Sequence, residues 1–390
     1  MRFLFVCSHQ IQNLIPLFTE LNKKKGLNFK VLFWEKLSEH HYDNDFKQKI
    51  NFNINFYENY NFHSLSIEKD STLNFFSFKN HLRIIIKLLN YLIKQDYDVV
   101  LFYGYYPAHI ISAIISKILG KKTIIRSISY NLGKKNILKK ILRNFYYRFA
   151  NLFFDEFWSV CKLNTDFYLN FGVDKKKITL INSSQITKQF VYKNNEDELL
   201  NKEKTLKSIN LSKEKKIILY SGKFNKKKRP LFLIEAFNNS KLTDEWCLLL
   251  SGGGGFYHND VLKLLEKNNS NKVKYIGYRD LKEMINLYNL SDIVVLPSDY
   301  GETHGNTLME AIQFGCALIA SDRVGLHHEI TKEELGLVFK ADNKSELSNH
   351  FEILTKDVDL LNKYKENGIK FSKNIKPDFV ADKIFETLNK

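Results

Sequence analysis

Two glutamates lie on either side of a glycine in the stretch PSDYGETHGNTLMEAIQFGCALIASD, residues 297–322. Glu302 and Glu310 are eight residues apart, and Gly305 lies between them. The run that follows predicts a helix beginning near Asn306, and the first amide groups of a helix can bind an anion such as phosphate. Carboxylates accept hydrogen bonds from hydroxyl groups. The pattern favours a ligand with phosphate at its centre and a sugar at each end. It also fits an alternative in which Glu310 is a surface acid of the helix and Gly305 only starts that helix.

A second motif that could bind an anion lies in YSGKFNKKKRPLFLIEAF, residues 220–237. Gly222 ends a predicted strand, and Lys223 and Lys228 follow it five residues apart. Lysines on a loop between a strand and a helix suit a diphosphate, because ammonium groups form charge-assisted hydrogen bonds to phosphate oxygens. A run of charges is also typical of a solvated loop, and Lys226 leaves the roles of individual lysines open. The spacing of Gly222 and Lys228 favours the binding role.

The two motifs belong to an alternation of predicted strands and helices that runs along the whole chain. Predicted strands include residues 2–6, 29–34 and 98–103, and predicted helices include residues 107–119 and 136–153. Short β-branched runs that alternate with helices indicate parallel sheets covered on both faces. We therefore predict an α/β protein, with two Rossmann-like domains whose parallel sheets face each other across a cleft.

The boundary between the domains is expected near residues 187–212, where the sequence is polar and charged. At 390 residues the chain is too long for one compact core. We predict an N-terminal domain over residues 1–190 and a C-terminal domain over residues 191–373. The last segment, residues 374–390, reads as a helix that a proline starts and that can cross back to the first domain.

Positive charge is concentrated in the first half of the chain. Residues 1–190 hold 28 Lys and Arg against 14 Asp and Glu, a net charge of +14. Residues 191–390 hold 31 against 29, a net charge of +2. Such a one-sided field indicates an anionic partner, which could be a membrane surface, a nucleic acid or a phosphorylated substrate.

The cysteines and the apolar runs predict where the protein works. Cys7, Cys161, Cys247 and Cys316 form no C-x-x-C pair and lie in or beside apolar runs, which predicts buried, reduced thiols in a cytoplasmic protein. The apolar run at the start is shorter than a signal peptide needs, and no run has the length of a membrane span.

The spacing E-x7-E, followed by A-x3-G and then S-D, resembles retaining glycosyltransferases of family 4, the glycosyl transferases group 1, which have the GT-B fold. The resemblance implies that Glu302 contacts the hydroxyls of the donor sugar and that Glu310 holds the ribose of the nucleotide. Where the family usually has E-G-F-G, this chain has E-T-H-G. That departure leaves the role of His304 open.

The same resemblance assigns residues to the donor diphosphate. Beyond Gly305, the main-chain amides of Asn306 and Thr307 would bind the distal phosphate. The lysine motif resembles the family's G-R-L-x3-K stretch, with Lys228 at the lysine position. Lys223 stands where the family usually has arginine, and an ammonium group cannot bind phosphate in a bidentate way.

Two further segments resemble the donor half of the family. SGGGG, residues 251–255, matches the glycine loop beside the donor site. YIGYRD, residues 275–280, matches the segment whose main chain contacts the nucleotide base, which points to Tyr278 and Arg279. The resemblance covers roughly residues 215–340, whereas in the first half it rests on topology.

The candidate catalytic residues, besides Glu302, are His9 and Tyr103, and Arg126 is the candidate acceptor-binding residue; all three lie at the ends of N-terminal strands. His9 lies in SHQIQ, which resembles a bacterial subgroup with Ser-His-Pro-Ile-Gln there; it would face the cleft, or it would cap the first helix. Tyr103 stands at a strand end where many relatives carry a histidine near the reacting centre, and His109 lies close by within a helix. Arg126 follows the strand KTII and could contact an anionic acceptor or a phosphate.

A metal site is not predicted. Asp-x-Asp occurs at residues 43–45, 96–98 and 357–359, but metal-dependent GT-A enzymes need such a pair after a buried strand, and none of these has that context. No His/Cys cluster has zinc spacing. We predict no cofactor and no metal, because lysines and a helix start can neutralise the diphosphate.

One predicted helix could explain the charge bias. KKNILKKILRNFYYRFANLFF, residues 134–154, has apolar residues at helical spacing, with Lys135, Lys139, Lys140 and Arg143 on the other face. A basic amphipathic helix can lie on an anionic membrane. The alternative is a domain helix with its apolar face in the core and a basic face in solvent.

These patterns predict a hexosyltransferase-type, retaining glycosyltransferase. It would move a sugar from a nucleotide-diphosphate sugar to a hydroxyl of a glycan or lipid-linked acceptor, in bacterial surface polysaccharide, lipopolysaccharide or lipid-linked glycan synthesis. It would work in the cytoplasm, peripherally at the inner face of the cell membrane, with an anionic membrane surface and no nucleic acid as partner. The alternatives are a sugar-nucleotide epimerase or phosphorylase of the same fold, or a basic nucleic-acid-binding protein, which would lack selective affinity for sugar nucleotides.

Overall fold

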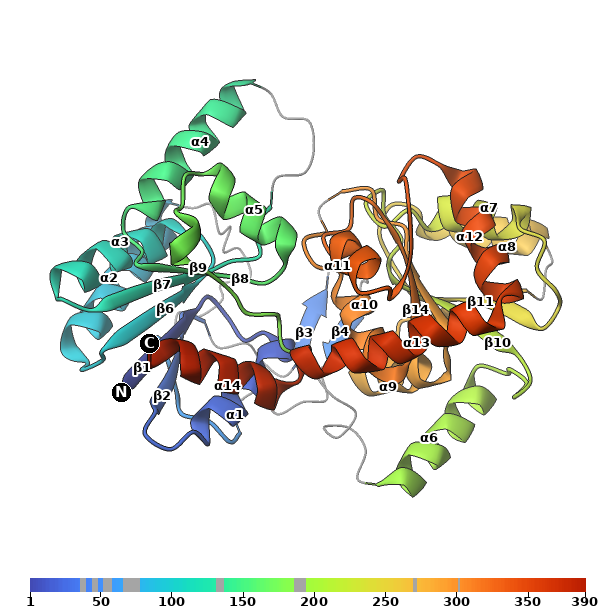
Figure 1. The fold of residues 1–390 in the computed structure, drawn as a ribbon, viewed down its shortest axis with the longest axis horizontal. Coiled ribbons are helices and arrows are strands. Elements are labelled where there is room, and N and C mark those ends of the chain that lie inside the picture. The colour runs from blue at the N-terminus through green and yellow to red at the C-terminus, as the bar shows by residue number, and fades with distance from the viewer. Residues whose placement is uncertain are drawn as a thin grey trace. The chain divides into compact units, whose positions relative to one another are not determined.

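The computed structural model describes residues 1–35, 40–43, 48–51, 58–65, 78–130, 137–185, 194–268, 272–300 and 302–390. Its contacts divide the chain into two compact units (Figure 1). The first unit comprises Met1–Glu39, Ile54–Ser184 and Pro377–Lys390, and the second comprises His40–Asn53 and Gln185–Lys376.

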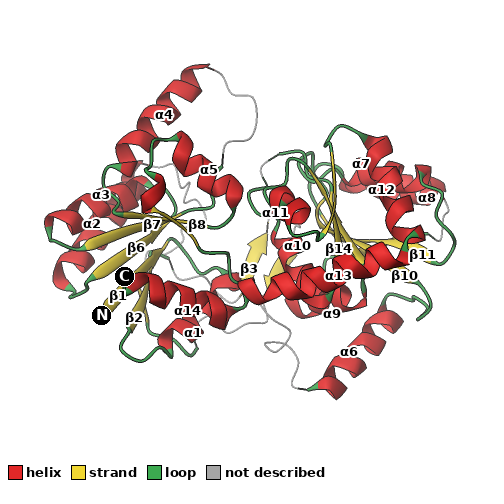
Figure 2. Cartoon of the chain, in the orientation of Figure 1, coloured by secondary structure: helices red, strands yellow, loops and turns green. Residues whose placement is uncertain are grey.

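The first unit is built on a seven-stranded parallel sheet in the order β5-β2-β1-β6-β7-β8-β9. The strands are β1 (Arg2–Cys7), β2 (Asn28–Phe33), β5 (Phe62–Ser64), β6 (Val99–Tyr103), β7 (Lys122–Arg126), β8 (Glu156–Ser159) and β9 (Ile178–Leu180). The helices are α1 (Ile15–Asn22), α2 (Phe78–Lys94), α3 (Pro107–Ile118), α4 (Ile137–Asn151), α5 (Lys162–Asn170) and α14 (Pro377–Leu388). Figure 2 shows helices on both faces of this sheet, which explains why β6 is apolar throughout and β1 is apolar and buried beyond Arg2.

The second unit is built on a six-stranded parallel sheet in the order β12-β11-β10-β13-β14-β15. The strands are β10 (Lys216–Lys223), β11 (Trp246–Gly253), β12 (Val273–Gly277), β13 (Ile293–Leu296), β14 (Ala317–Ser321) and β15 (Gly336–Phe339). The helices are α6 (Asn195–Ser208), α7 (Pro230–Asn239), α8 (His258–Asn268), α9 (Leu281–Leu290), α10 (Asn306–Ala311), α11 (His327–Lys332), α12 (Lys344–Lys356) and α13 (Val358–Ser372). A short antiparallel pair, β3 (His40–Asp43) and β4 (Gln48–Asn51), also belongs to this unit.

Alternate residues of the central strand β10 enter two different cores. Ile217 and Leu219 belong to one apolar cluster, and Ile218 and Tyr220 belong to the other. Successive side chains of a strand point to opposite faces, so each face of the sheet has a core of its own. The predicted α/β architecture with two parallel-sheet, Rossmann-like units is confirmed.

The polar segment near residues 187–212 contains a helix that the sequence analysis did not predict. Residues 187–193 lie outside the described residues, but α6 follows, with the Asn194 side chain accepting from Asp197 N as a cap. Glu198 of this helix accepts from Asn289 Nδ2 of α9 over 2.6 Å. The apolar periodicity of α6 is weak because none of its side chains is fully buried, whereas its cap and acidic first turn favour a helix start.

The last helix, α14, begins at Pro377 and groups with the first unit. It packs against α1, where Lys24 forms an ion pair with Asp382. Cys7, Cys161, Cys247 and Cys316 are all buried and free, as predicted. Among the described residues, no helix combines the length and the apolar character that crossing a membrane requires.

Candidate functional site

The predicted motifs of the second unit meet at one edge of its sheet. Strands β11, β10, β13 and β14 are parallel neighbours in that order, so their carboxyl ends lie at the same edge. β10 ends at Lys223, β11 ends at Gly253, and the loop after β13 carries Glu302. Open parallel sheets bind their ligands at this edge.

Glu302 and Lys228 form an ion pair there. Lys228 Nζ donates to Glu302 Oε2 over 2.6 Å, and Lys227 Nζ lies 3.5 Å from the same oxygen. The side chains of Lys228 and Glu302 are only 17% and 14% exposed. This burial lowers the pKa of Lys228, and the charge of Glu302 acts against that shift. The pair places a carboxylate, which can accept from hydroxyl groups, directly beside an ammonium group, which can donate to phosphate oxygens.

The lysine loop is tied to its surroundings, so it is not the freely solvated run that its composition also allowed. Asp299 N donates to Lys227 O over 2.9 Å, which joins this loop to the one that carries Glu302. The Asp299 carboxylate forms an ion pair with Arg323, whose guanidinium also pairs with Asp342 over 2.6 Å.

The loop that carries Glu302 is held by Gly325, which the sequence analysis did not single out. Gly325 N donates to Glu302 O over 2.8 Å, and Glu302 and Val324 form an isolated parallel bridge. A Cβ at Gly325 would lie 1.6 Å from Thr303 O, so no side chain fits at this close approach. The sequence signal for this contact was a glycine shortly after the S-D pair that ends the motif.

Gly305 starts α10 in a left-handed conformation, with φ of 76°. The helix begins at Asn306, as predicted, but it has only six residues and is followed by a short 3₁₀ turn that ends at Gly315, where φ is 73°. A helix this short aligns few peptide dipoles. Anion binding here would depend mainly on the amides of Asn306 and Thr307 and on the neighbouring lysines.

Glu310 is half-buried and contacts α9, so it is not the surface acid that the sequence also allowed. Tyr288 Oη donates to Glu310 Oε2 over 2.8 Å, and Tyr288 is buried. Burial raises the pKa of Tyr288, and the Glu310 carboxylate adds to that shift. A carboxylate has about four lone-pair sites, so such a group can accept from more than one hydroxyl group at a time.

The glycine loop after β11 packs against the end of β10. Gly222 and Gly252 are register partners, and a Cβ at Gly252 would lie 2.1 Å from Gly222 O. Phe224 N donates to Gly253 O over 3.2 Å, which continues the contact beyond the strand. Residues 252–255 all have positive φ, so glycine is needed for conformation as well as for space.

The other predicted donor residues lie at the same edge, with different surroundings. Lys223 is the half-buried last residue of β10, and Tyr278 follows β12. Arg279 donates from Nε to Ile276 O over 3.0 Å and from NH1 to Glu283 Oε1 over 2.9 Å. The Arg279 side chain is thus bonded to other groups of the protein at the start of α9. This is compatible with the prediction that the main chain of this segment, rather than its side chains, contacts the nucleotide base.

Three predicted residues of the first unit lie at the carboxyl ends of neighbouring strands, namely His9, Tyr103 and Arg126. His9 follows β1, and its Nδ1 lies 2.9 Å from Ser8 Oγ. Tyr103 ends β6, stacks on Phe5 with ring centroids 6.0 Å apart, and is opposite Arg126 of β7. Burial raises the pKa of Tyr103 to about 12. Tyr103 therefore stays protonated near neutral pH and can donate, but it cannot readily act as a base.

Arg126 is buried rather than open to an acceptor. Its NH1 donates to Ile181 O over 2.9 Å and its NH2 to Asn182 O over 3.0 Å. These bonds secure the segment after β9, and this geometry does not support the predicted contact with an anionic acceptor. His109 is also buried, with its Nδ1 2.8 Å from Gly104 O, and burial lowers its pKa to about 3. It is a neutral core residue of α3, as its place in the helix suggested.

No group of three or more His, Cys, Asp or Glu side chains among the described residues is placed to hold a metal ion. Asp98 instead pairs with Arg2 over 2.5 Å at the start of its strand, and Asp96 also pairs with Arg2. The second aspartate of the pair at residues 43–45 lies outside the described residues.

The parallel-sheet units and their fold neighbours define an α/β protein of the GT-B class. Residues 201–371 match the family model described as Glycosyl transferases group 1, so this part of the chain is a domain of that family.

The chain is similar to two curated proteins. It is 28% identical over 245 residues to the N,N'-diacetylbacillosaminyl-diphospho-undecaprenol alpha-1,3-N-acetylgalactosaminyltransferase of Campylobacter jejuni subsp. jejuni serotype O:2, covering 61% of this chain and 62% of that protein. It is 25% identical over 165 residues to YtcC of Bacillus subtilis (strain 168), covering 40% of each chain. The match therefore spans less than two thirds of the length of either relative.

Among solved structures, the chain is similar to Anabaena Alr3699/HepE in complex with UDP. The TM-score is 0.71, the sequence identity is 14%, and the match covers 100% of both chains. At this identity the likeness concerns the fold alone.

Proposed function

We propose that this protein is a retaining glycosyltransferase of family 4. It transfers a hexose-type sugar from a nucleotide-diphosphate sugar to a hydroxyl group of an acceptor. The bond between the anomeric carbon and the distal phosphate breaks, and the nucleoside diphosphate leaves with the bonding electrons. The acceptor oxygen bonds to the anomeric carbon on the same face, and its hydroxyl proton passes to the leaving diphosphate.

The observation that carries this proposal is the ion pair of Glu302 and Lys228 at the ligand-binding edge of the sheet. In the proposed complex, Glu302 accepts from the sugar hydroxyls, while Lys223 and Lys228 neutralise the charge that develops on the diphosphate. The amides of Asn306 and Thr307 add donors to the distal phosphate. Glu302 thus contacts the sugar and its partner Lys228 contacts the diphosphate, which are the two parts of the donor joined by the bond that breaks.

The nucleoside part of the donor extends toward α9 in this proposal. Glu310, whose carboxylate accepts from Tyr288 Oη, also accepts from the ribose hydroxyls. The main chain at Tyr278 and Arg279 contacts the base. The support is the placement of these residues at the same sheet edge as the ion pair.

We expect Glu310→Gln to lower the affinity for the nucleotide-diphosphate sugar by at least about tenfold, because charge-assisted hydrogen bonds contribute roughly 1.5–3 kcal/mol each. Glutamine can still accept from Tyr288 Oη, so thermal stability should change little. Glu310→Ala is the contrasting variant. It leaves the buried Tyr288 hydroxyl without this acceptor and should cost about 1–3 kcal/mol of stability. Titration calorimetry and thermal unfolding measure the two effects, and unaltered donor affinity in folded Glu310→Gln would reject the ribose contact.

The acceptor is proposed to be a glycan or a lipid-linked glycan of bacterial surface polysaccharide or lipopolysaccharide synthesis. The name of the Campylobacter relative describes transfer onto a diphospho-undecaprenol-linked sugar, which supports this class. His9 and Tyr103, at the ends of adjacent strands β1 and β6, are the proposed acceptor-side residues. The protein would act at the inner face of the cell membrane, on an anionic lipid surface.

The function is tested by incubating the protein with a panel of sugar nucleotides, with and without a lipid-linked glycan acceptor. We expect transfer only with acceptor, an anomeric configuration equal to that of the donor by NMR, and undiminished turnover in EDTA. Sugar conversion without acceptor would identify an epimerase, and phosphate-dependent release of sugar 1-phosphate would identify a phosphorylase. Tight, salt-sensitive binding of single-stranded nucleic acid without donor affinity would instead indicate the nucleic-acid-binding class. Loss of turnover in EDTA that added Mg²⁺ restores would contradict metal independence.

A further inference from the structure

His258 lies at the edge of the second sheet where the candidate donor site is placed, and none of the predicted motifs includes it. It is half-buried, it is the first residue of α8, and it follows shortly after the glycine loop, residues 252–255. Gly254 N donates to His258 Nδ1 over 3.2 Å. A ring nitrogen accepts a hydrogen bond only when it carries no proton, so the imidazole proton is assigned to Nε2.

Two further aromatic rings pack around the same loop. The ring of His258 stacks on Phe224, with centroids 6.0 Å apart, and makes a T-shaped contact with Tyr275 at 5.9 Å. Tyr275 Oη donates to Gly252 O over 3.2 Å, and burial raises the pKa of Tyr275, so this hydroxyl stays protonated. A Cβ at Gly253 would lie 2.6 Å from Tyr275 Oη and 3.3 Å from the His258 ring. The loop is therefore held by side chains as well as by the sheet.

The composition of the glycine loop explains why it needs such contacts. All four of its residues have positive φ, and glycine loses more conformational freedom on folding than any other residue. Without contacts to side chains, a loop of four glycines would sample many conformations. The hydrogen bonds at Gly252 O and Gly254 N restrict the loop to one of them.

The conformation of this loop is coupled to the end of β10, where a predicted diphosphate residue lies. Gly253 is the register partner of Lys223, and Phe224 N donates to Gly253 O over 3.2 Å. Tyr257 N donates to Phe224 O over 2.8 Å, which joins the segment before α8 to the same strand end. A displaced glycine loop would therefore displace the strand end that carries Lys223.

We propose that His258 is a positioning residue of the donor site, which it serves by holding the glycine loop against the end of β10. The inference rests on the proposed function, because the ligand concerned is the diphosphate of the donor. In this role the imidazole acts through the loop and does not touch the donor. An ordered site lowers the entropic cost of binding, so His258 contributes to donor affinity. The loop is in place both before and during the reaction, so losing the contact should raise the KM for the donor and leave kcat nearly unchanged.

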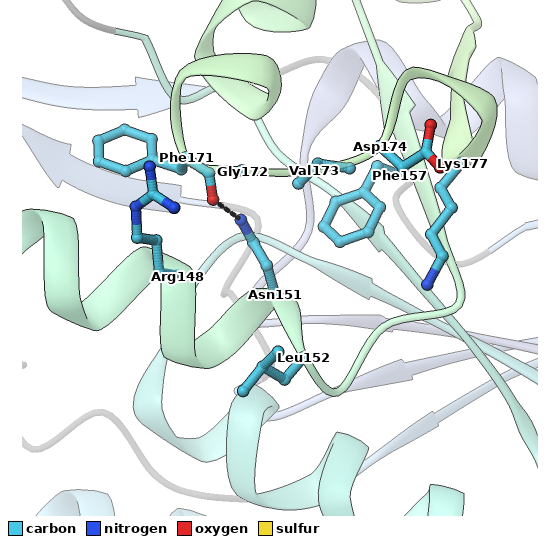
Figure 3. Close-up of a pocket in the computed structure, with 9 residues that line it drawn as sticks. All are labelled: Arg148, Asn151, Leu152, Phe157, Phe171, Gly172, Val173, Asp174 and Lys177. Atoms are coloured by element: carbon cyan, nitrogen blue, oxygen red, sulfur yellow. Dashed lines mark hydrogen bonds between the residues drawn. The ribbon is translucent and has the colours of Figure 1, made fainter.

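A hollow in the first unit also presents cations to solvent and must be distinguished from the donor site. It has a volume of about 330 Å³, and Arg148 and Lys177 are among its nine lining residues (Figure 3). Lys177 directly precedes β9, so the hollow lies at the amino end of that strand, whereas open parallel sheets bind ligands at the carboxyl ends. Asp174, which accepts from Lys176 N over 2.9 Å, also lines the hollow, and its charge opposes an anion.

The inference is tested by titration calorimetry of the full chain with UDP, GDP and ADP as probes. His258→Phe keeps an aromatic ring at this position but removes the acceptor for Gly254 N. It should weaken binding of the nucleoside diphosphate that the parent protein prefers by at least about fivefold. His258→Asn should restore most of the affinity, because the asparagine Oδ1 can accept at the position of Nδ1. His258→Gln, whose amide lies one bond further from the backbone, should behave like His258→Phe.

A second histidine of the same unit provides the matched control. His350 of α12 is half-buried and also bonds to the backbone, with its Nε2 3.1 Å from Val338 O. His350→Phe and, for the hollow, Lys177→Met should bind the nucleoside diphosphate like the parent protein. Amide hydrogen exchange at Gly254 reports the loop without any ligand. It should be at least about tenfold faster in His258→Phe and near the parental rate in His258→Asn, because the hydrogen bond protects this amide.

The outcomes separate a positioning role from a structural one. Parental affinity in folded His258→Phe and His258→Gln would overturn the proposal, as would faster exchange at Gly254 without a loss of affinity. An equal loss in His258→Asn or in His350→Phe would also overturn it, because the loss would then not depend on the acceptor at Nδ1. A greater loss in Lys177→Met would assign the diphosphate to the hollow. A parent protein that binds none of the three probes would refute the proposed function, and this inference with it.

Discussion

Glu302→Gln is expected to lower kcat/KM for sugar transfer by at least about a hundredfold. The substitution removes the charge that strengthens hydrogen bonds from two sugar hydroxyls, each worth roughly 1.5–3 kcal/mol. It also leaves Lys228 paired with a neutral amide, although the two side chains are mostly buried. Steady-state kinetics with the lipid-linked acceptor measures the loss. Full activity in a folded Glu302→Gln protein would show that this carboxylate does not contact the donor sugar.

The neighbouring lysines provide the control for this result. Lys228→Met removes the partner of Glu302 and a cation for the diphosphate, so donor affinity should fall by at least about tenfold. Lys226→Met is the matched change, because the Lys226 ammonium is 5.1 Å from the ring centre of Phe256, which is exposed. It should alter donor affinity by less than about threefold, as expected for an exposed cation. Equal losses in both lysine variants would indicate a diffuse electrostatic effect instead of a specific contact.

A double substitution distinguishes binding from stability. Breaking a buried ion pair by removing one partner leaves the other charge uncompensated, which destabilises the fold, whereas replacing both partners can be nearly neutral. Lys228→Met/Glu302→Gln should therefore recover most of the thermal stability that either single variant loses. It should not recover transfer activity, because neither group then remains for the donor.

The sequence was sufficient to predict the helices, the strands and the candidate site wherever a single local requirement decided the structure, such as the burial of an apolar strand or the start of a helix. Short apolar strands alternating with helices gave two parallel-sheet units, since only a sheet covered on both faces buries such strands. Gly305 and Asn306 marked a helix start that the structure confirms. The two motifs with Glu302 and Lys228 were assigned to one site, and the structure places these side chains 2.6 Å apart.

Other features depended on contacts between distant segments, which local patterns do not specify. The orientation of α4 is the clearest case, because its periodicity is compatible with an apolar face directed either way. Arg143, which was expected on the basic outer face, decides the matter by packing on three aromatic rings, two of which come from residues 167–171. The apolar side chains of Leu138 and Leu142 are exposed instead. Arg126 likewise looked available from its place after a strand, but the carbonyls that bind it lie more than fifty residues further along the chain.

The contact at Gly325 is a distant contact of the same kind, and it yields the prediction with the largest structural effect. Gly325→Ala is expected to destabilise the protein by about 2–4 kcal/mol, because the new Cβ would lie 1.6 Å from Thr303 O and the backbone of one segment must move. The same movement displaces Glu302, whose carbonyl accepts from Gly325 N. Misplacing a substrate-positioning group by about 1 Å can reduce the rate by up to a hundredfold, so transfer should fall by at least about tenfold.

Gly368→Ala is the matched control for this change. Gly368 lies within α13, and the nearest atom to a Cβ there would be 3.5 Å away, which is ordinary contact. Alanine is favoured over glycine inside a helix by about 1 kcal/mol, so this variant should be as stable as the parent or slightly more stable. Thermal unfolding and kcat/KM are measured on both variants at a temperature where each is folded. A Gly325→Ala protein that loses stability but keeps its kcat/KM would show that the glycine shapes the fold without positioning Glu302. If both quantities stayed unchanged, the close approach between residues 303 and 325 would itself be refuted.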